Sequence, residues 1–249
     1  ASWPTYPAVA PIARAARVPV VSFSNDVGVA GNGVFVMGFA PQQAVERVVR
    51  HARAKGVTKF AGLVPTGLYG QRASTAFLRS VEQAGGQVVA LQTFDRSQGS
   101  ISAAVSKLAA ASPYEAVLIA DSARTAVQAI PLIRARGGSA ARVLGTELWN
   151  AENSLATSPS LRGALFASVS DGVYTQLSAK YRTRFAKAPY RLASLGYDAV
   201  LLVTRIGTDW RFGQAFPVAR LTDVGGFSGI DGAFRFGRDG IAERALEVQ

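Results

Sequence analysis

The stretch Tyr114–Asn150 constrains the fold of this chain more than any other, because two apolar runs flank a helical apolar pattern. The first run, residues 116–120, stops abruptly, and the second, residues 142–144, follows Gly137-Gly138. This order predicts a βαβ unit, whose two strands run parallel and end at the same edge of a sheet. Ligands of open α/β sheets bind beyond that edge. The polar and aromatic residues that follow the two runs are therefore candidate ligand-binding residues: Asp121, Ser122, Glu147 and Trp149.

The same alternation extends over residues 59–145, where four predicted strands alternate with three predicted helices. This pattern predicts a doubly wound α/β lobe. PTGLYGQ, residues 65–71, follows the first of these strands as a predicted loop and places Tyr69 at the same edge. An earlier apolar run, Val18–Phe23, predicts a buried strand that ends in Ser24, Asn25 and Asp26. Near the carboxyl end, Asp239-Gly240 between alternating runs predicts a hairpin.

Composition supports a packed α/β protein. The 249 residues are 49% hydrophobic and 17% charged, which provides a core and excludes a disordered chain. No apolar run reaches the length of about 18 residues that a membrane helix needs. The chain has no cysteine, so disulfides, thiolate metal sites and cysteine nucleophiles are excluded.

The formal net charge of +11 raises the question of an anionic partner. The basic residues are mostly arginines scattered along the chain, with no block of five or six. Nucleic-acid binding usually shows a clustered basic footprint, so no nucleic-acid partner is predicted. A weak attraction to anionic lipid or to a cell-wall polymer fits this charge better.

Residues for catalysis are sparse. His51 is the only histidine and lies mid-helix on a polar stripe, which is typical of a solvated side chain. No dinucleotide-binding or P-loop pattern follows any predicted strand, and no pair of carboxylates shares an obvious setting. The prediction is a protein that is not an enzyme, with no cofactor and no metal.

Several candidate residues also have a purely structural explanation. Ser122 and Ser100 are predicted helix caps, and Asn25 with Asp26 can form the turn before Gly28. Trp149 can equally serve in packing between lobes. Tyr69 and Glu147 have weaker structural explanations, because neither is a cap or a typical core residue.

Longer segments resemble a known family. These are VPVVSFSND, VFVMGFAPQQAVERVVRHARAKGVTKFAGLVPTGLYGQ, GTELWN, LASLGYDAVLLV and GGFSGIDGAFRFGRDGIAER. They resemble type I periplasmic binding proteins over nearly the whole chain. The details SFSND, LYGQ, LW and FSGIDGAFRF are most similar to bacterial penicillin-binding protein activators, which are lipoproteins related to the branched-chain amino acid receptors of ABC transporters.

The resemblance implies an α/β clamshell of two doubly wound lobes with three crossings between them. The expected first lobe is residues 1–39 plus 168–225, and the expected second lobe is 40–167 plus 226–249. Family members begin with roughly three further strand–helix units, so the first lobe is expected to be incomplete. A missing or processed amino end is expected, with a lipid anchor and a periplasmic location.

The resemblance also implies roles for particular residues. Ser24, Asn25 and Asp26 match the loop that holds the ligand carboxylate in the amino acid receptors, although Asp26 departs from that pattern. Glu147 matches the acidic residue that holds the ligand ammonium, and Tyr69 matches an aromatic residue at the cleft between lobes. Two functions follow as expectations. The first is activation of a class A penicillin-binding protein, and the alternative is delivery of a small polar solute to an ABC permease.

Overall fold

The computed structural model describes residues 5–151 and 158–249, which form two compact units. Unit 1 contains residues 5–40 and 169–245, and unit 2 contains residues 41–151, 158–168 and 246–249. The chain therefore passes between the units three times, as the fold class predicts. None of the helices in the described ranges is long and apolar enough to span a membrane.

Unit 2 is built on a six-stranded sheet with the order β11-β7-β6-β5-β3-β4. All neighbours are parallel except β11, which runs antiparallel to β7. Its strands are β3 (Lys59–Pro65), β4 (Gln87–Phe94), β5 (Ala116–Ile119), β6 (Arg142–Gly145), β7 (Leu165–Ser168) and β11 (Glu247–Val248). Its helices are α2 (Pro41–Ala54), α3 (Leu68–Gln83), α4 (Gln98–Ala109) and α5 (Ala123–Ala135), with short 3-10 turns η2 (Glu147–Ala151) and η4 (Pro159–Leu161).

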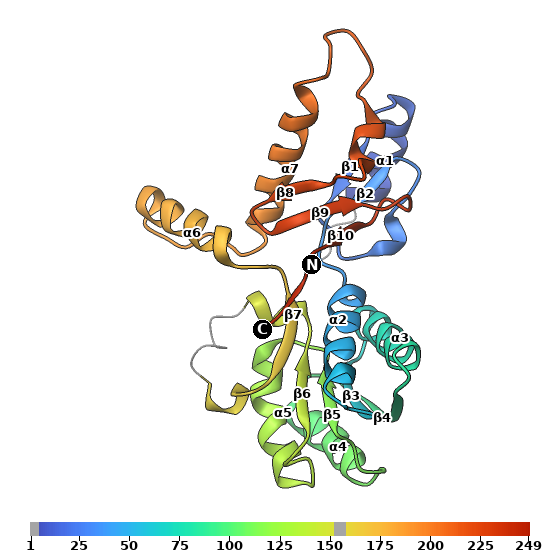
Figure 1. Ribbon diagram of the computed structural model, residues 1–249, viewed down its shortest axis with the longest axis vertical. Helices are drawn as coiled ribbons and strands as arrows, with labels where there is room; N and C mark the ends of the chain where they lie inside the picture. Colours follow the sequence, from blue (N-terminus) through green and yellow to red (C-terminus); the bar gives the residue numbers. More distant parts are fainter. Residues whose placement is uncertain (1–4, 152–157) are drawn as a thin grey trace. The chain divides into compact units, whose positions relative to one another are not determined.

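The helices of unit 2 cover both faces of its sheet (Figure 1). Successive strand residues alternate between the two cores, because side chains of a strand point to opposite faces. In β5, Val117 and Ile119 pack with α4 and α5, while Ala116 and Leu118 pack with α2 and α3. Both sets are apolar because neither face of the sheet meets water. The four strands and three helices predicted over residues 59–145 are confirmed.

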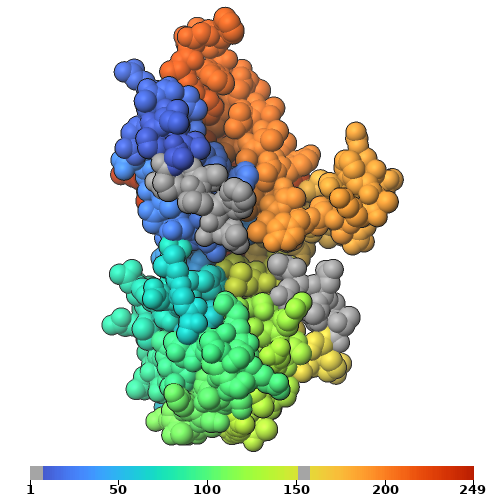
Figure 2. Space-filling model, turned by 180° about the vertical axis from the view of Figure 1, so that it is seen from behind, coloured from blue at the N-terminus to red at the C-terminus, as the bar shows by residue number. Residues whose placement is uncertain are grey.

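Unit 1 has smaller sheets. Its strands are β1 (Val20–Ser22), β2 (Val34–Val36), β8 (Phe227–Gly229), β9 (Gly232–Phe236) and β10 (Ala242–Arg244). Strands β1 and β2 form a parallel pair, and β10-β9-β8 form an antiparallel sheet. Its helices are α1 (Thr5–Ala15), α6 (Gly172–Phe185) and α7 (Ala193–Gly207), with 3-10 turns η1 (Val27–Val29) and η5 (Val218–Thr222). No residue of α6 is buried, and Figure 2 shows this helix in light orange as a protrusion.

The hairpin predicted at Asp239-Gly240 is present, but it does not belong to the expected lobe. Residues 226–245 lie in unit 1, and only residues 246–249 lie in unit 2. The reason is the core that the hairpin fills: Phe234 and Phe236 pack with Phe35, and Val36 bridges to Ile241. The alternating pattern predicts that a hairpin has an apolar face, but it does not say which core that face fills.

Candidate functional site

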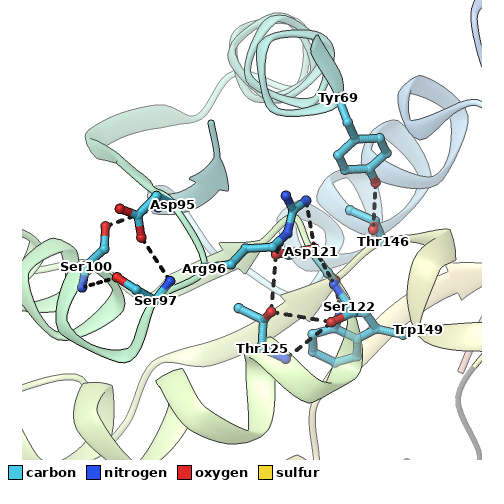
Figure 3. A network of polar contacts seen from close by, with 10 residues as sticks. All are labelled: Tyr69, Asp95, Arg96, Ser97, Ser100, Asp121, Ser122, Thr125, Thr146 and Trp149. Carbon is cyan, nitrogen blue, oxygen red and sulfur yellow. Dashed lines mark hydrogen bonds and ion pairs between the residues drawn. The ribbon is translucent and has the colours of Figure 1, made fainter. Parts of the chain in front are cut away.

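The carboxyl ends of β3, β4, β5 and β6 meet at one edge of the unit 2 sheet, as the parallel register requires. Polar side chains follow each of these four ends. They fall into two clusters, one around Tyr69 and Glu147 and one around Arg96 and Asp121. Figure 3 shows Tyr69 with Thr146, and Arg96 with Asp121. Among the described residues, no group of three or more histidine, cysteine or acidic side chains is placed to hold a metal ion.

Tyr69 lies in the first turn of α3, because this helix begins at Leu68 and not at about Gln71 as the sequence predicts. The early start depends on two glycines. Gly67 has a φ of 94°, which favours glycine. A Cβ on Gly70 would lie 1.6 Å from the carbonyl oxygen of Pro65, so no side chain fits there. This tight turn directs Tyr69 towards the end of β6, where its hydroxyl lies 3.0 Å from Thr146 Oγ1 and 3.0 Å from Glu147 Oε1.

The direction of these hydrogen bonds follows from the number of protons. A tyrosine hydroxyl has one proton and an ionised carboxylate only accepts, so Tyr69 donates to Glu147 and accepts from Thr146. Burial raises the pKa of the Tyr69 hydroxyl well above its ordinary value, and the nearby Glu147 charge raises it further. Tyr69 therefore remains protonated and acts as a fixed donor.

The second carboxylate oxygen of Glu147 is buried and has no hydrogen-bond partner among the described residues. Burial raises the pKa of Glu147 from 4.5 to about 7, against the lowering effects of a backbone hydrogen bond and of the Tyr69 hydroxyl. A buried carboxylate oxygen without a donor is unfavourable, since desolvation is then not compensated. The site therefore favours either a protonated Glu147 or an added donor beside Oε2.

Arg96 and Asp121 form the second cluster. Arg96 follows β4, and its Nε and Nη2 lie 2.8 Å and 3.3 Å from the two oxygens of Asp121. Asp121 is almost fully buried, and it also accepts hydrogen bonds from the Ser122 amide and the Thr125 hydroxyl. Ser122 caps α5 by accepting from Thr125 N, as the sequence predicts. The buried carboxylate of Asp121 therefore fixes the position of the Arg96 side chain.

Trp149 is not a ligand-facing residue, because its side chain is fully buried in the core with Phe166. Its indole nitrogen donates to the carbonyl oxygen of Asp121 at 2.8 Å, which ties η2 to the end of β5. A Cβ on Gly145 would lie 2.3 Å from the indole ring, so this glycine makes room for it. The expected ligand contact by Trp149 is replaced by core packing that supports the two clusters.

The remaining predicted residues, Ser24, Asn25 and Asp26, lie in unit 1 after β1. Ser24 Oγ accepts from Asp26 N at 2.9 Å, and Asp26 Oδ1 accepts from Gly28 N at 2.8 Å as the cap of η1. The predicted turn is therefore present, and Asn25 at its centre is exposed. These contacts explain the local sequence without assigning a ligand to it.

The sequence missed two side chains at the unit 2 edge, Thr146 and Arg96. Both directly follow a strand, so the signal was available in the loop sequences DRSQGS and TELWN. In the loop DRSQGS, the sequence predicts Ser100 as the cap of α4, and this prediction is wrong. Ser97 caps α4 instead, by accepting a hydrogen bond from Ser100 N. Ser100 instead accepts from Asp95 N, so both serines hold the loop that carries Arg96.

A family model described as periplasmic binding protein matches residues 2–249. The chain belongs to the periplasmic binding protein family. Among solved structures, this periplasmic binding protein is similar to a putative branched-chain amino acid ABC transporter protein from Rhodospirillum rubrum. The TM-score is 0.79 at 20% identity, and the match covers 95% of this chain and 71% of that chain.

Two further solved structures have the same fold. The leucine binding protein LivK from Thermotoga maritima has a TM-score of 0.71 at 21% identity, with 98% of this chain and 72% of that chain covered. A solute binding protein of an ABC transporter from Rhodopseudomonas palustris, in complex with 3,4-dihydroxybenzoic acid, has a TM-score of 0.72 at 17% identity, with 99% and 71% covered. A search of curated proteins finds no match. These likenesses establish the type I fold of this periplasmic binding protein and leave its ligand open.

Proposed function

We propose that this chain is a periplasmic solute-binding protein that holds a small polar ligand, for delivery to an ABC permease, without chemical conversion. The family supports binding and a periplasmic location, and the solved structures with this fold support the link to ABC transport. The observation that carries the proposal is the Oε2 atom of Glu147, which is buried and has no hydrogen-bond partner among the described residues. It lies at the carboxyl-terminal edge of the sheet, where ligands of open α/β sheets bind.

The chemistry of Glu147 limits what the ligand presents to it. Tyr69 already donates to Oε1, so Oε2 needs a second donor when the carboxylate is ionised. An ammonium group supplies both a donor and a compensating charge, and it would lower the pKa of Glu147 from about 7. A ligand ammonium should therefore bind more tightly at pH 8 than at pH 5.5.

Ser24, Asn25 and Asp26 are proposed as further ligand contacts. Their support is the match of this loop to the carboxylate-holding loop of the amino acid receptors, together with the exposure of Asn25. Asp121 and Ser122 are proposed to act through the loops that they hold, since their side chains bind Arg96 and Thr125.

A second candidate is the activator function, in which the protein contacts a class A penicillin-binding protein. It rests on the SFSND and FSGIDGAFRF segments and on the net charge of +11, which suits an anionic cell-wall setting. The solved structures with this fold favour solute binding instead. A lipid anchor belongs to this second candidate and stays a prediction.

A thermal-shift screen with amino acids and aromatic acids tests the proposal. A ligand at about 100 times its Kd stabilises the native state by about 2.7 kcal/mol, which raises Tm measurably. Glu147→Ala should remove the shift for ligands with an ammonium group. Glu46→Gln is the control, because Glu46 forms a surface ion pair with Arg50 on α2. A screen in which no compound raises Tm, combined with pull-down of a class A penicillin-binding protein, would favour the activator function.

A further inference from the structure

Arg96 has an unusual backbone conformation for its residue type. Its φ is 71°, in the left-handed region that residues with a side chain rarely adopt. The loop around it is held on both sides, by Ser97 N donating to Asp95 Oδ1 and by Ser97 Oγ accepting from Ser100 N (Figure 3). The loop thus fixes Arg96 in a strained conformation from which its side chain reaches Asp121.

The ion pair of Arg96 has a structural role but occupies only part of its side chain. It supplies the almost fully buried Asp121 with a charged partner through Nε and Nη2, while the Arg96 side chain as a whole stays 53% exposed. Left-handed backbone at a non-glycine residue costs free energy, and such residues concentrate at functional sites. The strained backbone holds the exposed part of Arg96 at the sheet edge where ligands of open α/β sheets bind, which points to recognition.

The guanidinium has donors left over. Asp121 binds its Nε and Nη2, and within residues 5–151 and 158–249 no acceptor lies within hydrogen-bond distance of Nη1. Arginine donates through a planar fork that matches a carboxylate, so a fork held from one side by Asp121 still presents donors on the other. Arg96 and Asp121 follow β4 and β5, and Tyr69 and Glu147 follow β3 and β6, so all four lie at one edge of the sheet. The Asp121 charge also acts on the Tyr69 hydroxyl.

We propose that Arg96 is a specificity-determining residue that binds a carboxylate of the ligand, with Asp121 as its positioning partner. The inference rests on the proposed solute-binding function and narrows its substrate class to small carboxylic acids. Glu147 then receives a donor group of the same ligand, and Arg96 receives an acidic group. A ligand of the same shape without this carboxylate gives the guanidinium donors of Arg96 no charged acceptor, so it binds more weakly than the acid.

Pairs of acid and amide probes test this inference. We would measure the Kd of L-leucine and L-leucinamide, and of benzoate and benzamide, by calorimetry on the whole protein. The acid of a pair should bind the unchanged protein more tightly, and Arg96→Gln should weaken the acid by at least about tenfold while changing the amide by less than about threefold. Arg96→Lys should give an intermediate loss, since it keeps the charge without the fork.

Arg79→Gln is the control for net charge, because Arg79 is exposed on α3 and forms no ion pair with any residue that the structure describes. It should leave all four Kd values unchanged. Equal weakening of acid and amide by Arg96→Gln would show a merely structural role and overturn the inference, as would an unchanged Kd for the acid. If Arg96→Gln folds poorly, the Kd values of Arg96→Lys for acid and amide distinguish selective from equal weakening in the same way. Failure of the proposed function shows differently, as binding of no probe by the unchanged protein, and it would overturn both proposals.

Discussion

The two units use α/β elements in different ways. Unit 2 buries a six-stranded sheet between helices on both faces, and its core side chains Phe60, Phe77 and Leu118 are fully buried. Among the described residues, unit 1 has sheets of two and three strands, and its helix α7 leaves Tyr197 46% and Val200 66% exposed. A central sheet covered on both sides holds the ends of its strands in place, so unit 2 is the unit with a preorganised polar edge.

The units also differ in what their buried charges do. In unit 1, buried carboxylates tie elements together: Asp198 on α7 accepts from the amides of Ile230 and Asp231, and Asp231 binds Arg191 at 2.7 Å. In unit 2, the buried oxygen Oε2 of Glu147 has no partner within the described residues. Oδ2 of Asp231 in unit 1 also lacks a hydrogen-bond partner among the described residues, but Asp231 is ion-paired with Arg191, whereas Glu147 forms no ion pair within that part of the chain. The two carboxylates therefore differ in charge compensation.

The largest expected effect tests the difference between the cores. Phe77→Ala in unit 2 should lower the free energy of unfolding by about 3–5 kcal/mol, because it removes a fully buried ring that packs against Phe60. Val200→Ser on the outer face of α7 should change it by less than about 0.5 kcal/mol, since surface substitutions rarely do more. Urea unfolding measures both. A large loss for Val200→Ser would mean that this face of α7 is covered in solution.

A smaller effect, which depends on pH, tests Glu147. A rise of its pKa from 4.5 to about 7 on folding means that the native state binds more protons than the unfolded chain between these values. The stability associated with this group is therefore fully present below about pH 4.5 and is lost as the pH rises to about 7. Glu147→Gln should be more stable than the unchanged protein by about 3 kcal/mol at pH 8 and equally stable at pH 4.

Unfolding curves from pH 4 to pH 8 measure this difference between the variant and the unchanged protein. Tyr69 on α3 and Asp121 after β5 are the other titratable groups that act in this cluster, and both are retained in the variant. A difference that does not change with pH would show that Glu147 has the same charge in the folded and unfolded states.

The smallest expected effect concerns a buried carboxylate of unit 1 that accepts backbone hydrogen bonds. Asp198→Asn replaces an acceptor of two buried amides by a group that accepts only on one side, so it should cost about 1–3 kcal/mol. The control is Asp209→Asn, whose exposed ion pair with Arg220 should be worth less than about 1 kcal/mol. Thermal unfolding compares the two. Equal losses would remove the contrast between the units, since the buried carboxylate would then contribute no more than a surface one.

Much of unit 2 was predictable from the sequence because its signals are local. The apolar runs at residues 59–65, 116–119 and 142–145 are long enough to identify as strands, and glycines follow the ends of α3 and α5. The meeting of Tyr69 and Glu147 followed from the parallel order of those strands, since their carboxyl ends share one edge.

The other features could not be read from local pattern. Apolar and polar residues alternate along the hairpin as predicted. The unit in which the hairpin packs depends on the contact between Phe35 and Phe236, which are about 200 residues apart in the chain. Trp149 follows a strand end as a ligand-binding aromatic residue would. It lies in the core because Gly145, which has no side chain, leaves room for the indole ring. Arg96 looked like one of many scattered arginines until its loop conformation directed it to Asp121.

The amino-acid sequence by itself determined the alternation of strands and helices, and with it the edge where polar side chains gather. Periodicity and turn residues act over a few positions, so each segment carries its own signal. The tertiary structure alone decided which polar atoms of those side chains have hydrogen-bond partners and which do not. Hydrogen-bond partners and burial depend on segments far apart in the chain, and for that reason the lone oxygen of Glu147 and the free donors of Arg96 become visible only in the folded protein.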